Sequence, residues 1–109
     1  MAKGPEALLV DRMRRAILKR WPEAYIVKVA GGGYQSAGLP DLLVQVAGRS
    51  AWIEVKAVRE GESKDHALSR VTLRQQAEID KIRRAGITAG VAMSVEEALD
   101  LVQRAVWSE

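Results

Sequence analysis

The chain contains no cysteine, only three prolines and a single histidine among its 109 residues. Without cysteine there are no disulfides, no thiol nucleophile and no cysteine-ligated zinc. No apolar run approaches the roughly 20 residues that a membrane-spanning helix needs. The N-terminal stretch lacks the apolar core and small-residue cleavage site of a secretory signal. We therefore expect a cytoplasmic protein that does not associate with a membrane.

The length predicts one domain, residues 1–109, with one modest core. The formal net charge is +3 and the pI is about 9.5, so the chain is mildly basic. Its positive charge gathers in the first predicted helix and at its exit, at Arg12, Arg14, Arg15, Lys19 and Arg20. Such a cluster is typical either of a surface that binds the phosphates of nucleic acid or of a solvated helix face.

Apolar spacing and turn residues predict a compact α/β domain. The predicted elements are a helix from Pro5 to near Trp21, a strand over 25–29, a glycine-rich loop over 30–38, strands over 41–46 and 51–57 joined by residues 47–50, an exposed polar loop over 58–70, a helix over 72–85, a strand over 87–93 and a last helix from 95 to about 106. The first three strands form a meander. The fourth follows a crossover helix, so we expect it to run parallel to a neighbour.

Three charged residues, Asp41, Glu54 and Lys56, interrupt the otherwise apolar hairpin. A turn at residues 47–50 brings positions 41 and 56 roughly opposite each other, and Glu54 and Lys56 share a strand face. Two converging carboxylates repel each other unless a cation lies between them. Magnesium accepts such oxygen-only coordination. The alternative is an ordinary surface pair between Glu54 and Lys56.

Pro40-Asp41 and Glu54-Val55-Lys56 together resemble the PD-(D/E)XK nuclease motif. The surrounding pattern is similar to the VRR-NUC branch of that superfamily: an early helical Glu6, then Gly38-Leu39-Pro40-Asp41-Leu42-Leu43, Ile53-Glu54-Val55-Lys56 and a helical Gln75. The resemblance covers most of the chain. It implies a restriction-endonuclease-like core: a mixed sheet of about four strands flanked by helices, in the order αβββαβα.

The resemblance also implies roles for individual residues. Asp41, Glu54 and the backbone carbonyl of Val55 would ligate magnesium, or manganese as a substitute, with Glu6 acting through water. Lys56 would orient or activate the attacking water, and Gln75 would complete the catalytic set. For two of these residues a structural role stays open. Glu6 also suits the first turn of a helix, and Gln75 also fits a capping box opened by Thr72.

The substrate implied by the resemblance is DNA. Arg12, Arg14, Arg15 and Lys19 would hold its backbone without reading sequence, and Tyr34 and Gln35 of the glycine-rich loop would lie against it. Compact members of the family imply a Holliday-junction resolvase that acts as a homodimer, since two symmetric nicks in a four-way junction need two symmetric sites. The alternatives are a flap, fork or nicking nuclease of the same fold, a non-catalytic DNA-binding module, and a plain structural domain.

Overall fold

A computed structural model of the chain describes residues 3–29 and 38–108. Its elements are α1 (Pro5–Arg20), β1 (Tyr25–Lys28), β2 (Leu42–Val46), β3 (Arg49–Val55), α2 (Lys64–Ser69), α3 (Leu73–Arg84), β4 (Thr88–Ala92) and α4 (Val95–Trp107). This is the predicted order with one short helix added. None of the helices in these residues is long and apolar enough to cross a membrane.

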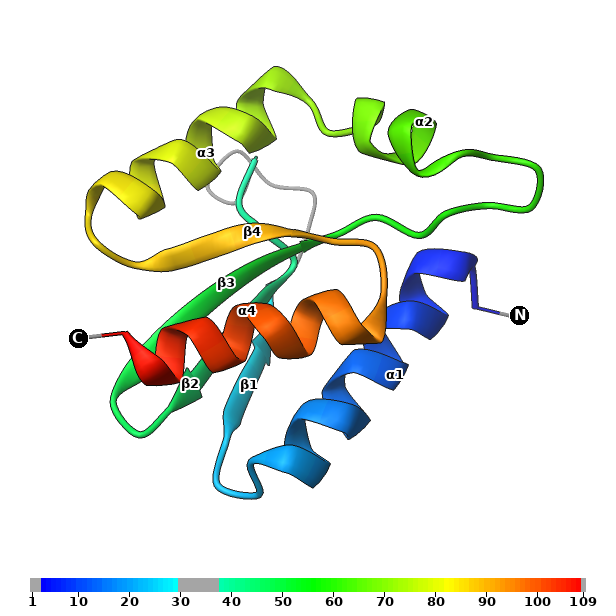
Figure 1. Ribbon diagram of the computed structural model, residues 1–109. Coiled ribbons are helices and arrows are strands. Elements are labelled where there is room, and N and C mark those ends of the chain that lie inside the picture. Colours follow the sequence, from blue (N-terminus) through cyan, green and yellow to red (C-terminus); the bar gives the residue numbers. More distant parts are fainter. Residues whose placement is uncertain (1–2, 30–37, 109) are drawn as a thin grey trace.

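The four strands form one mixed sheet in the order β1-β2-β3-β4. The first three strands are antiparallel neighbours, and β4 runs parallel to β3 (Figure 1). The connection from β3 to β4 carries α2 and α3. The predicted meander and the predicted parallel fourth strand are therefore both confirmed.

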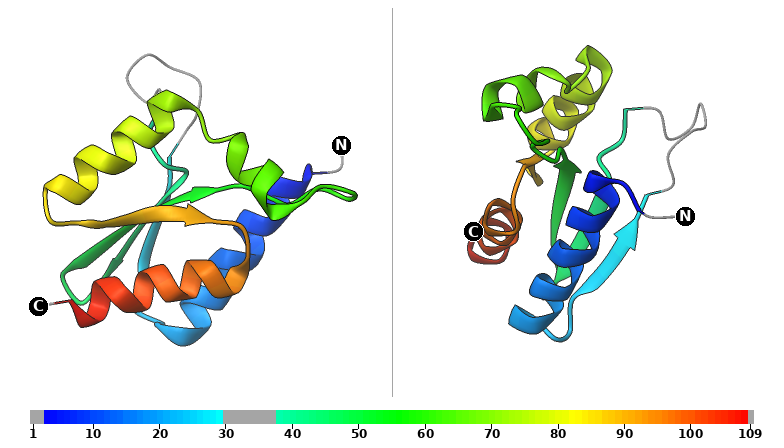
Figure 2. Two further views of the ribbon diagram at one scale, coloured as in Figure 1. Left: turned by 45° about the horizontal axis from the view of Figure 1, so that its top comes forward. Right: turned by 90° about the vertical axis from the view of Figure 1, so that its right-hand side faces the viewer.

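Helices α1 and α4 cover one face of this sheet. Alternate residues of β2 and β3 face them, because successive side chains of a strand point to opposite faces. The shared core includes Met13, Ile17, Leu42, Val44, Ile53, Val55, Leu101 and Val102. The same alternation turns Trp52 and Glu54 toward the other face, where α3 lies. In both views of Figure 2, α3 lies apart from α1 and α4.

The hairpin between β2 and β3 is tighter than predicted. Only Ala47 and Gly48 form its turn, with φ of 51° and 76°, and Val46 pairs directly with Arg49. Two positive φ values are the signature of a two-residue turn that matches the twist of a hairpin. With Leu42 opposite Ile53, one further step along the ladder sets Asp41 level with Glu54. The expectation that position 41 lies opposite position 56 is therefore wrong by two residues.

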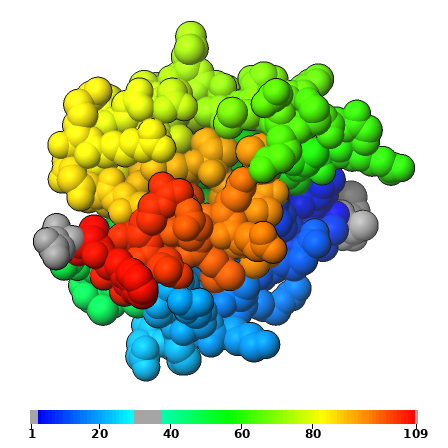
Figure 3. Space-filling view, viewed as in Figure 1, coloured from blue at the N-terminus to red at the C-terminus, as the bar shows by residue number. Residues whose placement is uncertain are grey.

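The segment over 58–70, predicted as a loop, contains the short helix α2. Ser63 caps it by accepting a hydrogen bond from the backbone N–H of His66, and Ala67 is its buried residue. This segment forms the green upper right of the molecule, beside the blue start of α1 (Figure 3). Because Ala67 is its buried residue, α2 lacks a pattern of apolar residues at helical spacing, and the sequence therefore does not predict it.

Candidate active site

Two carboxylates meet where the hairpin strands end. Asp41 directly precedes β2, and its Oδ2 accepts a hydrogen bond from the backbone N–H of Val55 at 2.7 Å. Within an extended strand, the N–H and C=O of one residue point to the same side. The carbonyl of Val55 therefore also faces the side of Asp41, whereas the N–H of Lys56 turns to Ala92 of β4 at 3.1 Å. Two carboxylates and one carbonyl therefore lie close together where β2 begins and β3 ends.

Glu54 is a buried acid, with an exposed fraction of only 2%. Its Oε2 accepts a hydrogen bond from Gln75 Nε2 at 3.1 Å and lies 3.4 Å from Lys56 Nζ. Its Oε1 is equally buried and has no hydrogen-bond partner in the described parts of the chain. Burial, followed by the negative charge of Asp41, raises the pKa of Glu54 to about 7, against the opposing effect of Lys56.

Gln75 caps α3 and also contacts Glu54, while its catalytic role stays a prediction. Its Oε1 accepts a hydrogen bond from the backbone N–H of Thr72 at 2.9 Å. Its own backbone N–H donates to Thr72 Oγ1 at 3.1 Å, which completes a capping box at the start of α3. Because the amide oxygen is engaged by the cap, the amide NH₂ group is turned toward Glu54. The helix cap thus orients the donor that meets the buried carboxylate.

Glu6, in the first turn of α1, is held by an arginine. Its Oε1 accepts a hydrogen bond from Arg70 Nη1 at 2.9 Å, and its side chain is 41% exposed. No group of three or more acidic, histidine or cysteine side chains gathers into a metal cluster within residues 3–29 and 38–108. A role for Glu6 near a metal, acting through water, stays a prediction.

Solved structures supply a comparison at the level of the fold. No protein-family model matches the sequence, and no curated protein matches it. One similar structure is described as a VRR_NUC domain; it is 23% identical, covers 85% of this chain and 92% of its own, and has a TM-score of 0.58. Another, a VRR_NUC domain protein, is 19% identical, covers 88% of this chain and 86% of its own, and has a TM-score of 0.60.

The chain has the VRR_NUC fold. Its mixed four-stranded sheet, flanked by helices, is the restriction-endonuclease-like core that the sequence predicted. A more distant likeness is to Hjc, a Holliday junction resolvase from the archaeal hyperthermophile Archaeoglobus fulgidus, at 23% identity and a TM-score of 0.46, over 77% of this chain and 67% of that one. That last likeness adds nothing to the assignment of the fold.

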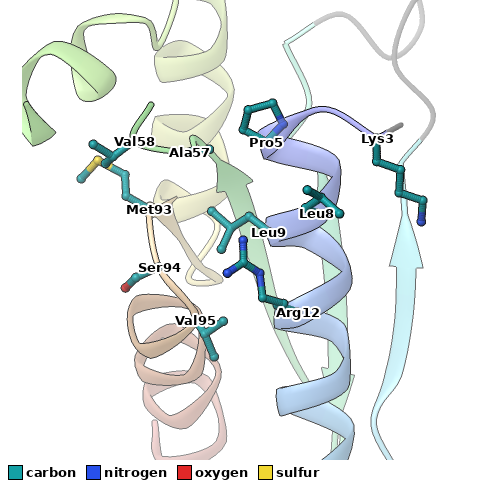
Figure 4. Close-up of a pocket in the computed structure, with 10 residues that line it drawn as sticks. All are labelled: Lys3, Pro5, Leu8, Leu9, Arg12, Ala57, Val58, Met93, Ser94 and Val95. Carbon is teal, nitrogen blue, oxygen red and sulfur yellow. The ribbon is translucent and has the colours of Figure 1, made fainter. Parts of the chain in front are cut away.

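On this VRR_NUC fold, the predicted DNA-binding residues fall into two groups. Arg12, Arg14, Arg15 and Lys19 lie on α1, which covers the sheet face opposite the Glu54 side chain. Arg12 lines a cavity of about 490 Å³ between α1, the residues after β3 and the start of α4, and Figure 4 shows its side chain among those that line this cavity. That cavity is separate from the carboxylate pair. Tyr34 and Gln35 lie outside the described residues.

Two arginines on the β3–β4 connection were not among the predicted site residues. Arg74 is exposed and directly precedes Gln75. A Cβ added at Gly38 would lie 2.9 Å from Arg74 Cγ, so the chain entering β2 passes close to the start of α3. Arg70 binds Glu6. Arg74 could have been noticed in the sequence because it directly precedes Gln75. No local pattern marks Arg70, because no local pattern links it to Glu6, which is far away along the chain.

Proposed function

We propose that this protein is a divalent-metal-dependent DNA endonuclease, with its active site at Asp41, Glu54, Lys56 and Gln75. The observation that carries the proposal is the buried, unpartnered Oε1 of Glu54 beside a second carboxylate. A buried carboxylate oxygen without a donor costs free energy, and two adjacent carboxylates repel each other. A cation bound between them removes both costs.

The residues present fit magnesium. Asp41 and Glu54 would hold it with the carbonyl of Val55, an all-oxygen set that leaves positions for water and substrate oxygens, as magnesium prefers. Manganese suits the same ligands. When bound, such an ion supplies a water of lowered pKa and Lewis-acid polarisation of the phosphate.

Lys56 and Gln75 would complete the chemistry from the protein side. The ammonium of Lys56 lies against Glu54 with only 11% of its side chain exposed, so its positive charge is held in place. That charge would stabilise the charge that develops on the phosphoryl oxygens and orient the attacking water. Gln75 would keep Glu54 Oε2 engaged, so that Oε1 stays directed at the metal.

For the substrate, we propose branched DNA and, within that class, a four-way junction cut by a homodimer. The resemblance in the sequence supports this assignment, together with the fit between a two-fold dimer and a junction that needs paired nicks. The basic residues of α1 would hold a DNA arm that extends beyond the carboxylate pair, since phosphate contacts position a duplex without reading its sequence.

The test compares a labelled four-way junction with matched linear duplex, flap and fork substrates, in magnesium, manganese and EDTA. Lys56→Gln is the variant, because glutamine keeps a donor for Glu54 but removes the charge. We expect paired symmetric nicks that require the metal and that the variant loses. Glu60→Gln is the matched control, since Glu60 is exposed in the loop after β3, and it should cleave as the wild type does.

Other outcomes would test the chemistry, the choice of substrate and the dimer separately. Cleavage of flap, fork or linear DNA would keep the chemistry and discard the junction. Single rather than paired nicks would discard the dimer. DNA binding without cleavage in either metal would replace the nuclease with a DNA-binding module.

A further inference from the structure

The first part of the connection from β3 to β4 leaves the candidate site and comes back to it. It leaves the sheet directly after Lys56 and returns at the start of α3, which carries Gln75. Both residues contact the same oxygen, Glu54 Oε2, from the two ends of this excursion. The positions of Lys56 and Gln75 therefore depend on what holds the two ends of this segment together, and Arg70 does so.

The guanidinium of Arg70 binds three separate segments. Nη2 donates to the carbonyl of Ala57 at 2.5 Å and to Glu62 Oε1 at 3.0 Å. Nε donates to Glu62 Oε2 at 3.1 Å, so Glu62 is held by both of its oxygens. Nη1 donates to Glu6 of α1 at 2.9 Å. We call Arg70 and these partners the Arg70 clasp. Figure 1 shows the segment that carries it above the start of α1.

The clasp acts on the backbone next to the site. Lys56 has one neighbouring backbone anchor on β4, through its N–H and Ala92, and the next anchor along the chain is the Ala57 carbonyl held by Arg70. At the other end, Arg70 lies two residues before Thr72, the N-cap that orients the Gln75 amide. A bidentate guanidinium–carboxylate pair has a fixed geometry, and the Arg70 side chain is only 20% exposed.

We propose that Arg70 is a positioning residue of this site: it closes the 57–70 excursion so that Lys56 and Gln75 both reach Glu54. The proposal rests on the nuclease function proposed above. Arg70 itself touches neither substrate nor metal in this role. Displacement of a positioned group by about 1 Å can cost about 100-fold in rate, so loosening the clasp should lower turnover more than it lowers affinity for DNA.

The kinetic test uses Arg70→Ala and Arg70→Lys, with Arg83→Ala as the matched control. Arg83 also lies on the connection and also binds a backbone carbonyl, that of Ala89 at 2.9 Å, but at the far end of α3. We expect Arg70→Ala to lower kcat by about 10- to 100-fold with KM changed less than about threefold. Arg70→Lys should restore part of kcat, because lysine keeps a hydrogen-bond donor and the positive charge but cannot bind both oxygens of Glu62 as the planar guanidinium does.

A second measurement does not depend on cleavage. The side-chain amide of Gln75, identified by its loss in Gln75→Ala, should exchange slowly with solvent in the wild type and in Arg83→Ala, since it donates to a buried carboxylate. In Arg70→Ala it should exchange fast while the backbone amides of β2 and β3 stay protected. If the wild type cleaves no DNA, the nuclease proposal fails and this measurement alone decides the positioning role.

Three results would overturn the role of Arg70. An unchanged kcat in Arg70→Ala would show that the clasp does not serve the site. An equal loss in Arg83→Ala would show that any weakening of the connection suffices. Slow exchange of the Gln75 amide in Arg70→Ala would show that the contact with Glu54 forms without the clasp.

Discussion

Burial of Glu54 lowers the free energy of unfolding, and this effect can be measured in the metal-free protein. Its side chain is 2% exposed, and its pKa is raised from 4.5 to about 7, first by burial and then by Asp41. Each pKa unit corresponds to about 1.4 kcal/mol, so ionised Glu54 lowers the free energy of unfolding by on the order of 3 kcal/mol. Glu54→Gln removes that charge and keeps an oxygen that accepts from Gln75.

The sign of the effect follows from proton binding. The folded protein holds the Glu54 proton more tightly than the unfolded chain does, because its folded pKa is the higher one. The favourable contribution of protonated Glu54 to the free energy of unfolding is therefore fully present below about pH 4.5 and is lost as the pH rises through about 7. Above that range, Glu54→Gln should be more stable than the wild type in EDTA, by on the order of 10 °C in Tm for a domain of this size.

The assay is thermal unfolding in EDTA between pH 5 and pH 8.5. The wild type should lose stability across this range, and Glu54→Gln should not. Glu60→Gln should follow the wild type, because Glu60 is exposed. Added magnesium should stabilise the wild type at pH 8 and leave Glu54→Gln unchanged. A Glu54→Gln protein that is no more stable than the wild type at pH 8 would refute the picture of a strained, buried carboxylate.

Further predictions concern single contacts. Ala47→Asn should raise the free energy of unfolding by about 1 kcal/mol in urea, because φ at Ala47 is 51° and asparagine tolerates that region better; no gain would contradict the turn geometry. Thr72→Ala should cost about 1 kcal/mol through loss of the cap and lower kcat, while Thr72→Ser should do neither. Arg70 lowers the pKa of Glu62 to about 2. The pair therefore contributes its full stabilisation of the folded protein above about pH 4.5, and this stabilisation is lost as the pH falls through about 2. Arg70→Ala should therefore unfold at a higher pH on acid titration, and an unchanged midpoint would refute the linkage.

The sequence anticipated the elements that carry strong local patterns. The apolar spacing of α1, the alternation along β2 and β3 and the Thr72 cap of α3 each appear where they were expected. The hairpin register was wrong because turn length depends on whether Ala47 accepts a positive φ, which alanine rarely does. A four-residue turn was the ordinary expectation for such a sequence.

The site was predictable only as far as its motif reached. Asp41 and Glu54 could be paired from the sequence because a hairpin joins them. The unpartnered Oε1 of Glu54 depends on how β3, β4 and α3 pack around it, and no local pattern records that. The clasp of Arg70 was equally invisible, since Glu6 lies 64 positions away along the chain. Contacts of that kind come from tertiary packing alone.

The two-residue turn also bears on how this molecule folds. It brings Asp41 and Glu54 level with each other through contacts that are close in sequence, and hairpins of that kind close within microseconds. Parallel pairing of β3 with β4 must await closure of the long connection through α2 and α3, and such non-local contacts form slowly. We therefore expect the two acidic side chains to meet before Gln75 arrives, with their mutual repulsion opposing closure of the hairpin. Neutralising either acid should then speed refolding, and an unchanged refolding rate would contradict this order of events.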